Sequence, residues 1–218
     1  MYGGDACPAC ETMPLKPAPP PPADRAPKGY EFLAPLGKGG MGVVYKARQL
    51  NLDRVVALKL LPRERLGNIE SESRFEREAK AMASLNHPNI VAVYDFGSDG
   101  GYYLAMELVE GEDLRKSVGT MDPERVREVA CQLLDALDYA HSRGVVHRDI
   151  KPENVLIDAK GRARLADFGL ARLLGIEEDM RLTQSEDMVG TIRYMSPEQM
   201  RKAADADSRS DLYSLGVV

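Results

Sequence analysis

Three side chains that can take part in chemistry lie close together in the segment HRDIKPENVL, at residues 147–156. Asp149 and Asn154 are five residues apart, Lys151 lies between them, and two valines precede the segment. A carboxylate can accept a proton, an amide oxygen can bind a metal ion, and an ammonium group can neutralise an anion. A polar cluster that follows a buried run is either a well-bonded turn or a place where reactants are held.

A predicted β-hairpin brings a second carboxylate to this cluster. The runs NVLID and RARLAD flank AKG, a short turn ending in glycine, so residues 154–167 are expected to form two antiparallel strands. Counted from Lys160, Asn154 is six residues back and Asp167 is seven residues forward, so they face each other within one residue of register. Such oxygens suit Mg²⁺, which takes one or two protein oxygens and fills its other positions with phosphates and water.

We therefore expect Asn154 and Asp167 to hold Mg²⁺, with Asp149 as a separate carboxylate beside the metal. A structural loop rich in Asp and Asn explains any one of these residues, but not all of them in this order. The glycine after Phe168 allows the backbone to turn sharply beyond the metal ligand.

A lysine in an apolar strand is the next candidate. Both faces of VVALKLL are apolar, so Lys59 is expected to be enclosed and to need a carboxylate partner. Glu78 is such a partner because it lies on the inward stripe of a predicted helix. The alternative is that Lys59 extends to solvent and Glu78 pairs with Arg74 one turn earlier.

A glycine-rich segment, GKGGMGVVY, separates two strand-like runs. Gly37, Gly39 and Gly42 allow bare backbone amides to approach an anion closely. A hairpin turn without a ligand explains the pattern equally well. The position between two strands argues against a dinucleotide-binding crossover, which needs a helix after the glycines.

The elements that must position these groups fall into two parts. Strands are expected at residues 30–37, 42–50, 55–61, 90–97 and 102–109. One helix, over residues 71–85, interrupts them, and its inward stripe is Phe75, Ala79, Met82 and Leu85.

Helical periodicity dominates the second part. Residues 123–144 predict a helix closed by Gly144. Its expected apolar stripe is Val126, Val129, Ala130, Leu133, Leu134 and Leu137. A further helix begins at Ser208 or Ser210, and the chain stops inside its apolar stripe, so we expect a C-terminally truncated domain. The predicted fold class is α+β, with a β-rich lobe over residues 30–108 and a helical lobe over residues 109–218.

Composition excludes several classes of protein. The 218 residues are 44% apolar and 29% charged, with a net charge of -5, which gives no electrostatic footprint for nucleic acid. No run reaches the ~18 apolar residues of a membrane span, and the start lacks the regions of a signal peptide. Three cysteines cannot build a disulfide framework, which agrees with a reducing, cytoplasmic location.

The first 29 residues are expected to be a disordered, proline-rich tail. PLKPAPPPPADRAPK, at residues 14–28, favours an extended spacer. Cys7 and Cys10 form half of a zinc ribbon's ligand set, but no second Cys or His pair follows within reach. Zinc binding is the alternative to a disordered tail.

Taken together, the motifs identify the chain as a member of the eukaryotic-type protein kinases, and it resembles their bacterial serine/threonine branch. The segments that carry the resemblance are GKGGMGVV, VALK, FEREA, HRDIKPEN, DFG, GTIRYMSPE and SDLYSLGVV, in the family's order from residue 30 to residue 218. The resemblance implies a bilobal kinase fold, ATP and Mg²⁺ as cofactors, and phosphoryl transfer to serine or threonine hydroxyls of proteins.

The resemblance also implies catalytic roles. Lys59, oriented by Glu78, contacts the α- and β-phosphates of ATP, and Asp167 and Asn154 hold Mg²⁺. Asp149 accepts or orients the substrate proton, and Lys151 neutralises the transferred phosphoryl group. Asp211 braces the catalytic loop from the last helix.

The implied nucleotide site is larger. The loop over the phosphates comprises Leu36, Gly37, Lys38, Gly39, Gly40 and Gly42. Val44, Ala57 and Leu156 enclose adenine, Met106 lies at the back of the pocket, and Glu107 to Val109 form the hinge.

Regulation and partners are implied too. Thr183 and Ser185 are expected to be autophosphorylated and to meet Arg148, with dimerisation for transfer between copies, whereas Thr191 is expected to contact Asp149 and Lys151. The alternative is a solvated polar loop. Protein substrates are expected, with no nucleic acid and no membrane segment, although the chain can be the cytoplasmic part of a membrane-anchored protein. Two other functions stay open: a noncatalytic nucleotide-binding module and a small-molecule phosphotransferase.

Overall fold

Five antiparallel strands form the first part of the chain. The computed structural model describes residues 26–39, 41–62, 69–99, 101–170, 192–202 and 205–218. Cys7, Cys10, Gly40, Thr183, Ser185 and Thr191 lie outside these residues. The strands lie in the order β1-β2-β3-β5-β4, and their bounds are β1 Tyr30–Gly39, β2 Gly42–Gln49, β3 Arg54–Leu60, β4 Val93–Gly97 and β5 Tyr103–Glu107.

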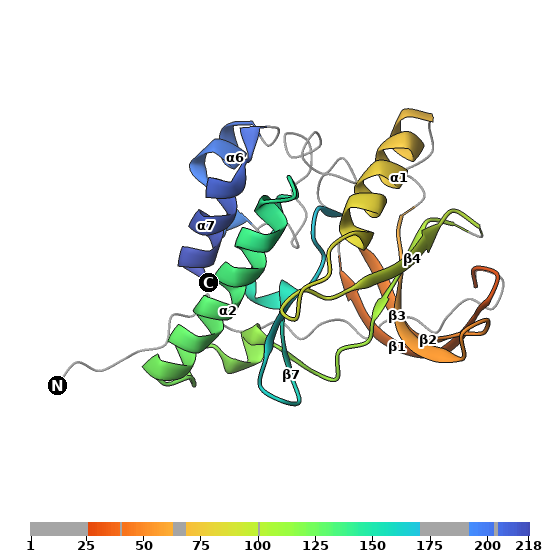
Figure 1. The fold of residues 1–218 in the computed structure, drawn as a ribbon, viewed down its shortest axis with the longest axis horizontal. Helices are drawn as coiled ribbons and strands as arrows, with labels where there is room; N and C mark the ends of the chain where they lie inside the picture. The colour runs from red at the N-terminus through yellow and green to blue at the C-terminus, as the bar shows by residue number, and fades with distance from the viewer. Residues whose placement is uncertain (1–25, 40, 63–68, 100, 171–191, 203–204) are drawn as a thin grey trace.

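Helix α1 (Ile69–Ala83) lies beside this sheet (Figure 1). Its predicted inward residues Phe75, Ala79 and Met82 are buried, as is Leu85 just after the helix. The ring of Phe75 packs edge-on against Tyr102, with centroids 5.1 Å apart. The predicted apolar stripe is therefore confirmed, and it fixes which side of α1 faces the strands.

The second part of the described chain is mainly helical. Helix α2 (Pro123–His141) begins at Asp122, whose side chain accepts a hydrogen bond from the Arg125 amide, an arrangement that satisfies a free amide of the first turn. Helices α6 (Pro197–Arg201) and α7 (Ser208–Val217) follow, and α7 lies beside α2 in Figure 1. The α+β class with two lobes is confirmed.

One part of the α2 prediction is wrong. Val129, Leu133 and Leu137 are buried, but Val126 and Leu134 are 53% and 45% exposed. The buried face of α2 continues instead through Ala136 and Ala140, because small residues allow the helix to approach its neighbours closely. The expected stripe was wider than the surface that α2 buries.

A small antiparallel sheet and two short 3-10 helices lie between the two main parts. The sheet has the order β6-β7-β8, and the bounds are β6 Gly111–Asp113, η4 Leu114–Ser117, η5 Pro152–Asn154, β7 Val155–Asp158 and β8 Ala163–Leu165. One continuous core cluster runs from α1 through β5 and β8 to α2. The small sheet therefore joins both parts. Among the described residues, no helix has the length and apolar character needed to cross a membrane.

Candidate active site

The β7-β8 hairpin positions two of the predicted site residues. Its paired residues, Val155 with Leu165 and Ile157 with Ala163, are equidistant from Lys160. Asn154 therefore lies opposite Ala166, whose amide donates to the Asn154 carbonyl at 2.8 Å. Asp167 is one residue further along, within the register that the count from Lys160 predicted.

Asp149, Lys151 and Asn154 form one cluster at this hairpin. The Lys151 Nζ lies 3.0 Å from Asp149 Oδ2. Asn154 Nδ2 donates to the Asp149 carbonyl oxygen at 2.7 Å and to its carboxylate at 2.9 Å. These two bonds use the nitrogen of the Asn154 amide, so its oxygen is the atom that is left for another ligand.

Asp211, on α7, holds the backbone that precedes this cluster. It is buried, and its carboxylate accepts from the His147 amide at 2.8 Å and from the Arg148 amide at 2.7 Å. The same carboxylate lies 2.7 Å from His141 Nε2. The predicted bracing of this loop by Asp211 is thus confirmed.

His147 is a second support, which the sequence analysis did not single out. The side chain is fully buried, its Nε2 lies 2.8 Å from the Ala166 carbonyl, and the Asp149 amide donates to its Nδ1 at 3.2 Å. It therefore bonds to both segments that carry the carboxylates. Its position two residues before Asp149, after an apolar run, was the available signal.

Replacing Asp211 with asparagine is expected to lower the free energy of unfolding by about 1–3 kcal/mol, because one of the buried backbone donors loses its acceptor. The measurement is the denaturant midpoint at constant m value. Asp207→Asn is the matched control, since Asp207 caps the start of α7 and asparagine caps equally well. Equal midpoints for the two variants would contradict the bracing role.

Lys59 is enclosed, as its strand pattern predicted. It is 4% exposed, and its Nζ lies 2.6 Å from Asp167 Oδ2. The alternative that it extends to solvent is wrong. This pair joins β3 to the segment after β8, two parts of the chain that are 108 residues apart.

The partner of Lys59 differs from the one expected from the sequence. Between Lys59 and Glu78, both in the described part of the chain, the structure has no ion pair. Glu78 instead lies 3.2 Å from Arg77, which is on the same helix. The Asp167 carboxylate, 2.6 Å from Lys59 Nζ, already neutralises this cation, so Lys59 does not require Glu78 as a second partner.

Two residues beside the cluster adopt left-handed backbone conformations. Arg148 has φ of 68° and Asp167 has φ of 63°. For residues other than glycine this costs about 1–3 kcal/mol, and it persists only where the surroundings hold it in place. Here the Arg148 amide donates to Asp211, and the Ala166 amide donates to Asn154. Such strain is typical of functional segments.

Three residues of the predicted adenine pocket, Val44, Ala57 and Met106, share one face of the large sheet. Val44 is the cross-strand partner of Lys59, and Ala57 is the partner of Met106. Directly opposite side chains point to the same side of a sheet, as do residues two apart on one strand. Leu156 and Val109 pack against the cluster that contains Ala57 and Met106. The structure therefore brings these residues together.

The glycines of the β1-β2 hairpin differ from one another. Gly37 pairs with Val44, and Gly39 pairs with Gly42 at the end of the hairpin. A Cβ atom at Gly37 or Gly39 would meet nothing within 4 Å. At Gly42, where φ is 134°, it would lie 2.1 Å from the Leu60 carbonyl oxygen. Gly42 is therefore required by the fold, and the other two face open space, with the exposed Leu36 and Lys38 beside them.

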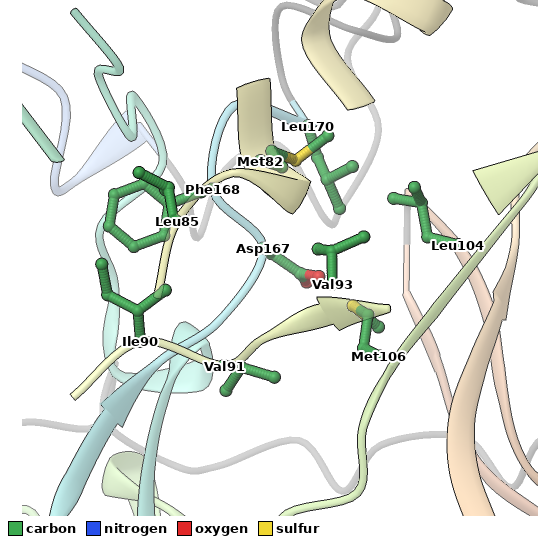
Figure 2. Close-up of a pocket in the computed structure, with 10 residues that line it drawn as sticks. All are labelled: Met82, Leu85, Ile90, Val91, Val93, Leu104, Met106, Asp167, Phe168 and Leu170. Carbon is green, nitrogen blue, oxygen red and sulfur yellow. The ribbon is translucent and has the colours of Figure 1, made fainter. Parts of the chain in front are cut away.

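A small apolar pocket lies behind Met106, between α1, β4, β5 and the segment 167–170. Figure 2 shows Phe168 pointing toward Leu85 and Ile90, while Asp167 extends toward Val93 and Met106. Only Met106 and Asp167 of its lining belong to the predicted site. Phe168 also packs against His147, with ring centroids 4.6 Å apart and the ring planes tilted by 53°, so it anchors the backbone of Asp167.

Helix α6 completes the surroundings of the cluster. Ser196 and Gln199 form a capping box, and Gln199 Nε2 donates to the Arg148 carbonyl at 2.9 Å. The Ser210 hydroxyl donates to Glu198 at 2.7 Å and holds the pKa of that carboxyl below its usual value. These bonds tie α6 both to the strained backbone at Arg148 and to α7.

The arrangement suits chemistry on a phosphate. Two carboxylates and one amide lie at the mouth of a hairpin, and a buried lysine and a second lysine supply positive charge beside them. One side of the sheet above is apolar and ends in two glycines without close neighbours. Such a site can hold a flat apolar ring and a polyanion at the same time.

Comparison with known proteins identifies one family. The protein kinase domain matches residues 30–218. The serine/threonine-protein kinase pkn3 of Myxococcus xanthus is 43% identical over 199 residues, which are 87% of this chain and 36% of that protein. PrkC of Bacillus subtilis is 41% identical over 193 residues, covering 87% of this chain and 29% of that protein.

A third relative extends the comparison to mycobacteria. The serine/threonine-protein kinase PknL of Mycobacterium tuberculosis is 44% identical over 193 residues, which are 87% of this chain and 47% of that protein. The chain thus spans less than half the length of each of these three relatives.

Proposed function

The chain belongs to the protein kinase domain family, and we propose that it is an ATP- and Mg²⁺-dependent protein serine/threonine kinase. The observation that carries the proposal is the convergence of Lys59 and Asp167 with the Asp149, Lys151 and Asn154 cluster at one hairpin mouth. The relatives are named serine/threonine-protein kinases. Residues 30–108 and 109–218 are proposed as the two lobes, after a tail at residues 1–29.

In this proposal the hydroxyl oxygen of a serine or threonine substrate attacks the γ-phosphorus of ATP. The bond from that phosphorus to the β-γ bridging oxygen breaks, ADP leaves with the electron pair, and Asp149 accepts the hydroxyl proton. Lys151, 3.0 Å from Asp149, neutralises charge on the transferred group. Lys59, whose Nζ lies 2.6 Å from Asp167 Oδ2, binds the α- and β-phosphates.

The residues present fit a magnesium ion. No group of three or more His, Cys, Asp or Glu residues in the described ranges forms a metal site by itself. The Asn154 amide donates through its nitrogen, which leaves its oxygen for a metal ion, and Asp167 follows Ala166, whose amide donates to the Asn154 carbonyl. Two protein oxygens with phosphates and water in the other positions suit Mg²⁺. When bound, Mg²⁺ supplies charge neutralisation for the phosphates.

Regulation by autophosphorylation is part of the proposal. Thr183 and Ser185, which lie outside the described residues, are the proposed acceptors, and transfer between two copies is the proposed route. Arg148 is the proposed phosphate partner, and its backbone is held by Asp211 and Gln199. Mass spectrometry of active protein is expected to find phosphate on at least one of the two hydroxyls.

The test of the function is transfer of labelled γ-phosphate from ATP to the chain itself and to a generic basic protein. Label on phosphoserine or phosphothreonine that requires Mg²⁺ is the expected result. Nucleotide binding without transfer would favour the noncatalytic module. Transfer only to a small molecule would favour the small-molecule phosphotransferase.

The glycines give a sharper prediction about ATP. Gly37→Ala and Gly39→Ala are expected to keep the unfolding midpoint of the unchanged chain, because their Cβ atoms meet no protein atom within 4 Å. Both are expected to weaken ATP binding by about tenfold, about 1.4 kcal/mol, because the added methyl groups occupy space proposed for the phosphates. Isothermal titration measures the affinity.

Gly42→Ala is the opposite case and serves as the control. Its Cβ would lie 2.1 Å from the Leu60 carbonyl, so the fold itself is expected to lose about 1–3 kcal/mol. If Gly37→Ala and Gly39→Ala bound ATP as tightly as the unchanged chain, the loop would not cover the phosphates.

A further inference from the structure

Arg164 on β8 is a buried cation outside every motif that pointed to the active site. It is 7% exposed. Its Nη2 donates to the Ile90 carbonyl at 3.0 Å and forms an ion pair with the carboxylate of Glu107. Its Nε is buried and has no hydrogen-bond partner among the described residues. Compensation of this buried charge therefore depends mainly on Glu107.

Glu107 is the last residue of β5 and the first residue of the proposed hinge. Its amide donates to the Ala92 carbonyl at 2.9 Å, and its carboxylate accepts from the Ala92 amide at 3.4 Å. The side chain of Glu107 is 28% exposed. Both the backbone and the side chain of Glu107 are thus tied to the segment before β4.

The same segment is bonded to β8 on its other side. The Leu165 amide donates to the Asn89 carbonyl at 2.8 Å, and the Val91 amide donates to the Leu165 carbonyl at 2.9 Å. Residues 89–92 therefore lie between the hinge and the hairpin, bonded to both. The Arg164 to Glu107 ion pair spans this segment and joins its two neighbours directly.

Arg164 also lies next to the proposed adenine site, on the side of Leu156. In the β7-β8 register it is the direct partner of Leu156, so the two side chains point to the same side of the hairpin. Leu156 is the proposed floor of the adenine pocket, and the hinge is its edge. The position of the floor relative to the edge is what the ion pair fixes.

We propose that Arg164 is a positioning residue for nucleotide binding, which acts through Glu107 to hold the hinge backbone in register with Leu156. The inference rests on the proposed function, because it presupposes that adenine binds between these elements. A positioned hinge binds adenine without first losing conformational freedom. The ion pair is therefore expected to set nucleotide affinity and to leave the rate of phosphoryl transfer unchanged.

The principal test is Arg164→Met in the full chain, with titrations of both ATP and adenosine. Both dissociation constants are expected to rise by the same factor, about tenfold. With saturating ATP, kcat is expected to stay within about twofold of that of the unchanged chain, and the change is expected to appear as a higher KM for ATP. Adenosine has no phosphates. If the lost positive charge acted only on the polyphosphate, the variant would bind ATP more weakly and adenosine unchanged.

The same hairpin offers a matched control. Arg162 pairs with Asp158 at 2.9 Å, and the side chain of Arg162 is 45% exposed, so the pair contributes little. Asp158 also accepts hydrogen bonds from the Lys160 and Arg162 amides, and it keeps these when the Arg162 side chain is lost. Arg162→Met is therefore expected to leave both dissociation constants unchanged. Arg164→Lys keeps a charge but cannot reproduce the planar guanidinium group of arginine. Its dissociation constants for ATP and adenosine are expected to lie between those of the unchanged chain and those of Arg164→Met.

Glu107→Gln gives a second approach that does not depend on the folding of Arg164→Met. It keeps an acceptor for the Ala92 amide but removes the charge, and it is expected to weaken the binding of adenosine as well as that of ATP. In the double variant Arg164→Met with Glu107→Gln, the loss is expected to be no greater than that of the larger single change, because both changes remove one interaction.

The outcomes separate the inference from the function on which it rests. If the unchanged chain binds neither ATP nor adenosine, both are overturned. If the unchanged chain binds ATP, and Arg164→Met binds both ATP and adenosine as tightly as the unchanged chain does, only the inference is overturned. Weaker binding of ATP with unchanged binding of adenosine in Arg164→Met also overturns the inference. If Arg164→Met does not fold, unchanged adenosine affinity in Glu107→Gln is the overturning result.

Discussion

Asp149→Asn is expected to lower kcat for phosphoryl transfer by about 10²–10⁴-fold, the usual contribution of a positioned base. The amide cannot accept the hydroxyl proton, yet it keeps the shape of the side chain. Asn154 Nδ2 can still donate to the backbone carbonyl of residue 149, so the loop is expected to keep its conformation. The measurement is kcat and KM for ATP with a protein substrate, together with the dissociation constant for ATP.

The dissociation constant is the informative control in this experiment. It is expected to change by less than about threefold, because the proposed contacts to ATP come from other residues. Asp99→Asn removes an exposed carboxylate, 52% exposed and 3.9 Å from Lys28, and is expected to leave kcat unchanged. An Asp149→Asn variant with undiminished kcat would remove Asp149 from its proposed role.

Asp167→Asn is expected to abolish the strengthening of ATP binding by Mg²⁺. In the unchanged chain, the affinity for ATP is expected to rise with added Mg²⁺, because the ion joins Asp167 and Asn154 to the phosphates. The Asp167→Asn change removes the only charged protein ligand proposed for Mg²⁺, and it also leaves the buried Lys59 without its carboxylate. Loss of one partner of a buried pair costs about 3–5 kcal/mol, discounted here because Asp167 is 19% exposed.

The readout is the ratio of ATP dissociation constants without and with Mg²⁺. That ratio is expected to approach one in Asp167→Asn and to keep its full value in Asp99→Asn. A circular dichroism melt identifies any loss of fold. A folded Asp167→Asn variant with the full Mg²⁺ effect would place the metal elsewhere.

Local features of the site were predictable from the sequence because they depend on short stretches of chain. The hairpin around Lys160 follows from two apolar runs and a glycine turn, and its register was correct within one residue. The buried stripe of α1 follows from helical spacing. The enclosure of Lys59 follows from two apolar strand faces.

The partners of buried charges were not predictable in the same way. Lys59 pairs with Asp167, 108 residues away, although Glu78 lies on a nearby helix face. Both are acidic, and the position of α1 relative to the sheet decides between them. That position depends on the packing of the whole core, which no short stretch of sequence contains.

The same limit explains two other differences. Residues 90–92 are apolar and were included in a predicted strand, but β4 begins at Val93. The earlier residues bond to Leu165 and Glu107 instead. Val126 and Leu134 are apolar and were placed on the inward stripe of α2, but the described core covers only the narrower face through Val129 and Leu133. In both cases, residues distant in sequence determine where the strand begins or which face of the helix is buried.

The most direct test of the account is a crystal structure of the chain with Mn²⁺ in place of Mg²⁺ and a nonhydrolysable ATP analogue. The expected result is an anomalous peak within about 2.0–2.3 Å of oxygens of Asp167 and Asn154. Adenine is expected between Ala57 and Leu156, and the γ-phosphorus is expected to face Asp149. A metal bound to neither Asp167 nor Asn154, or a nucleotide outside the space between the sheet and the hairpin, would contradict it.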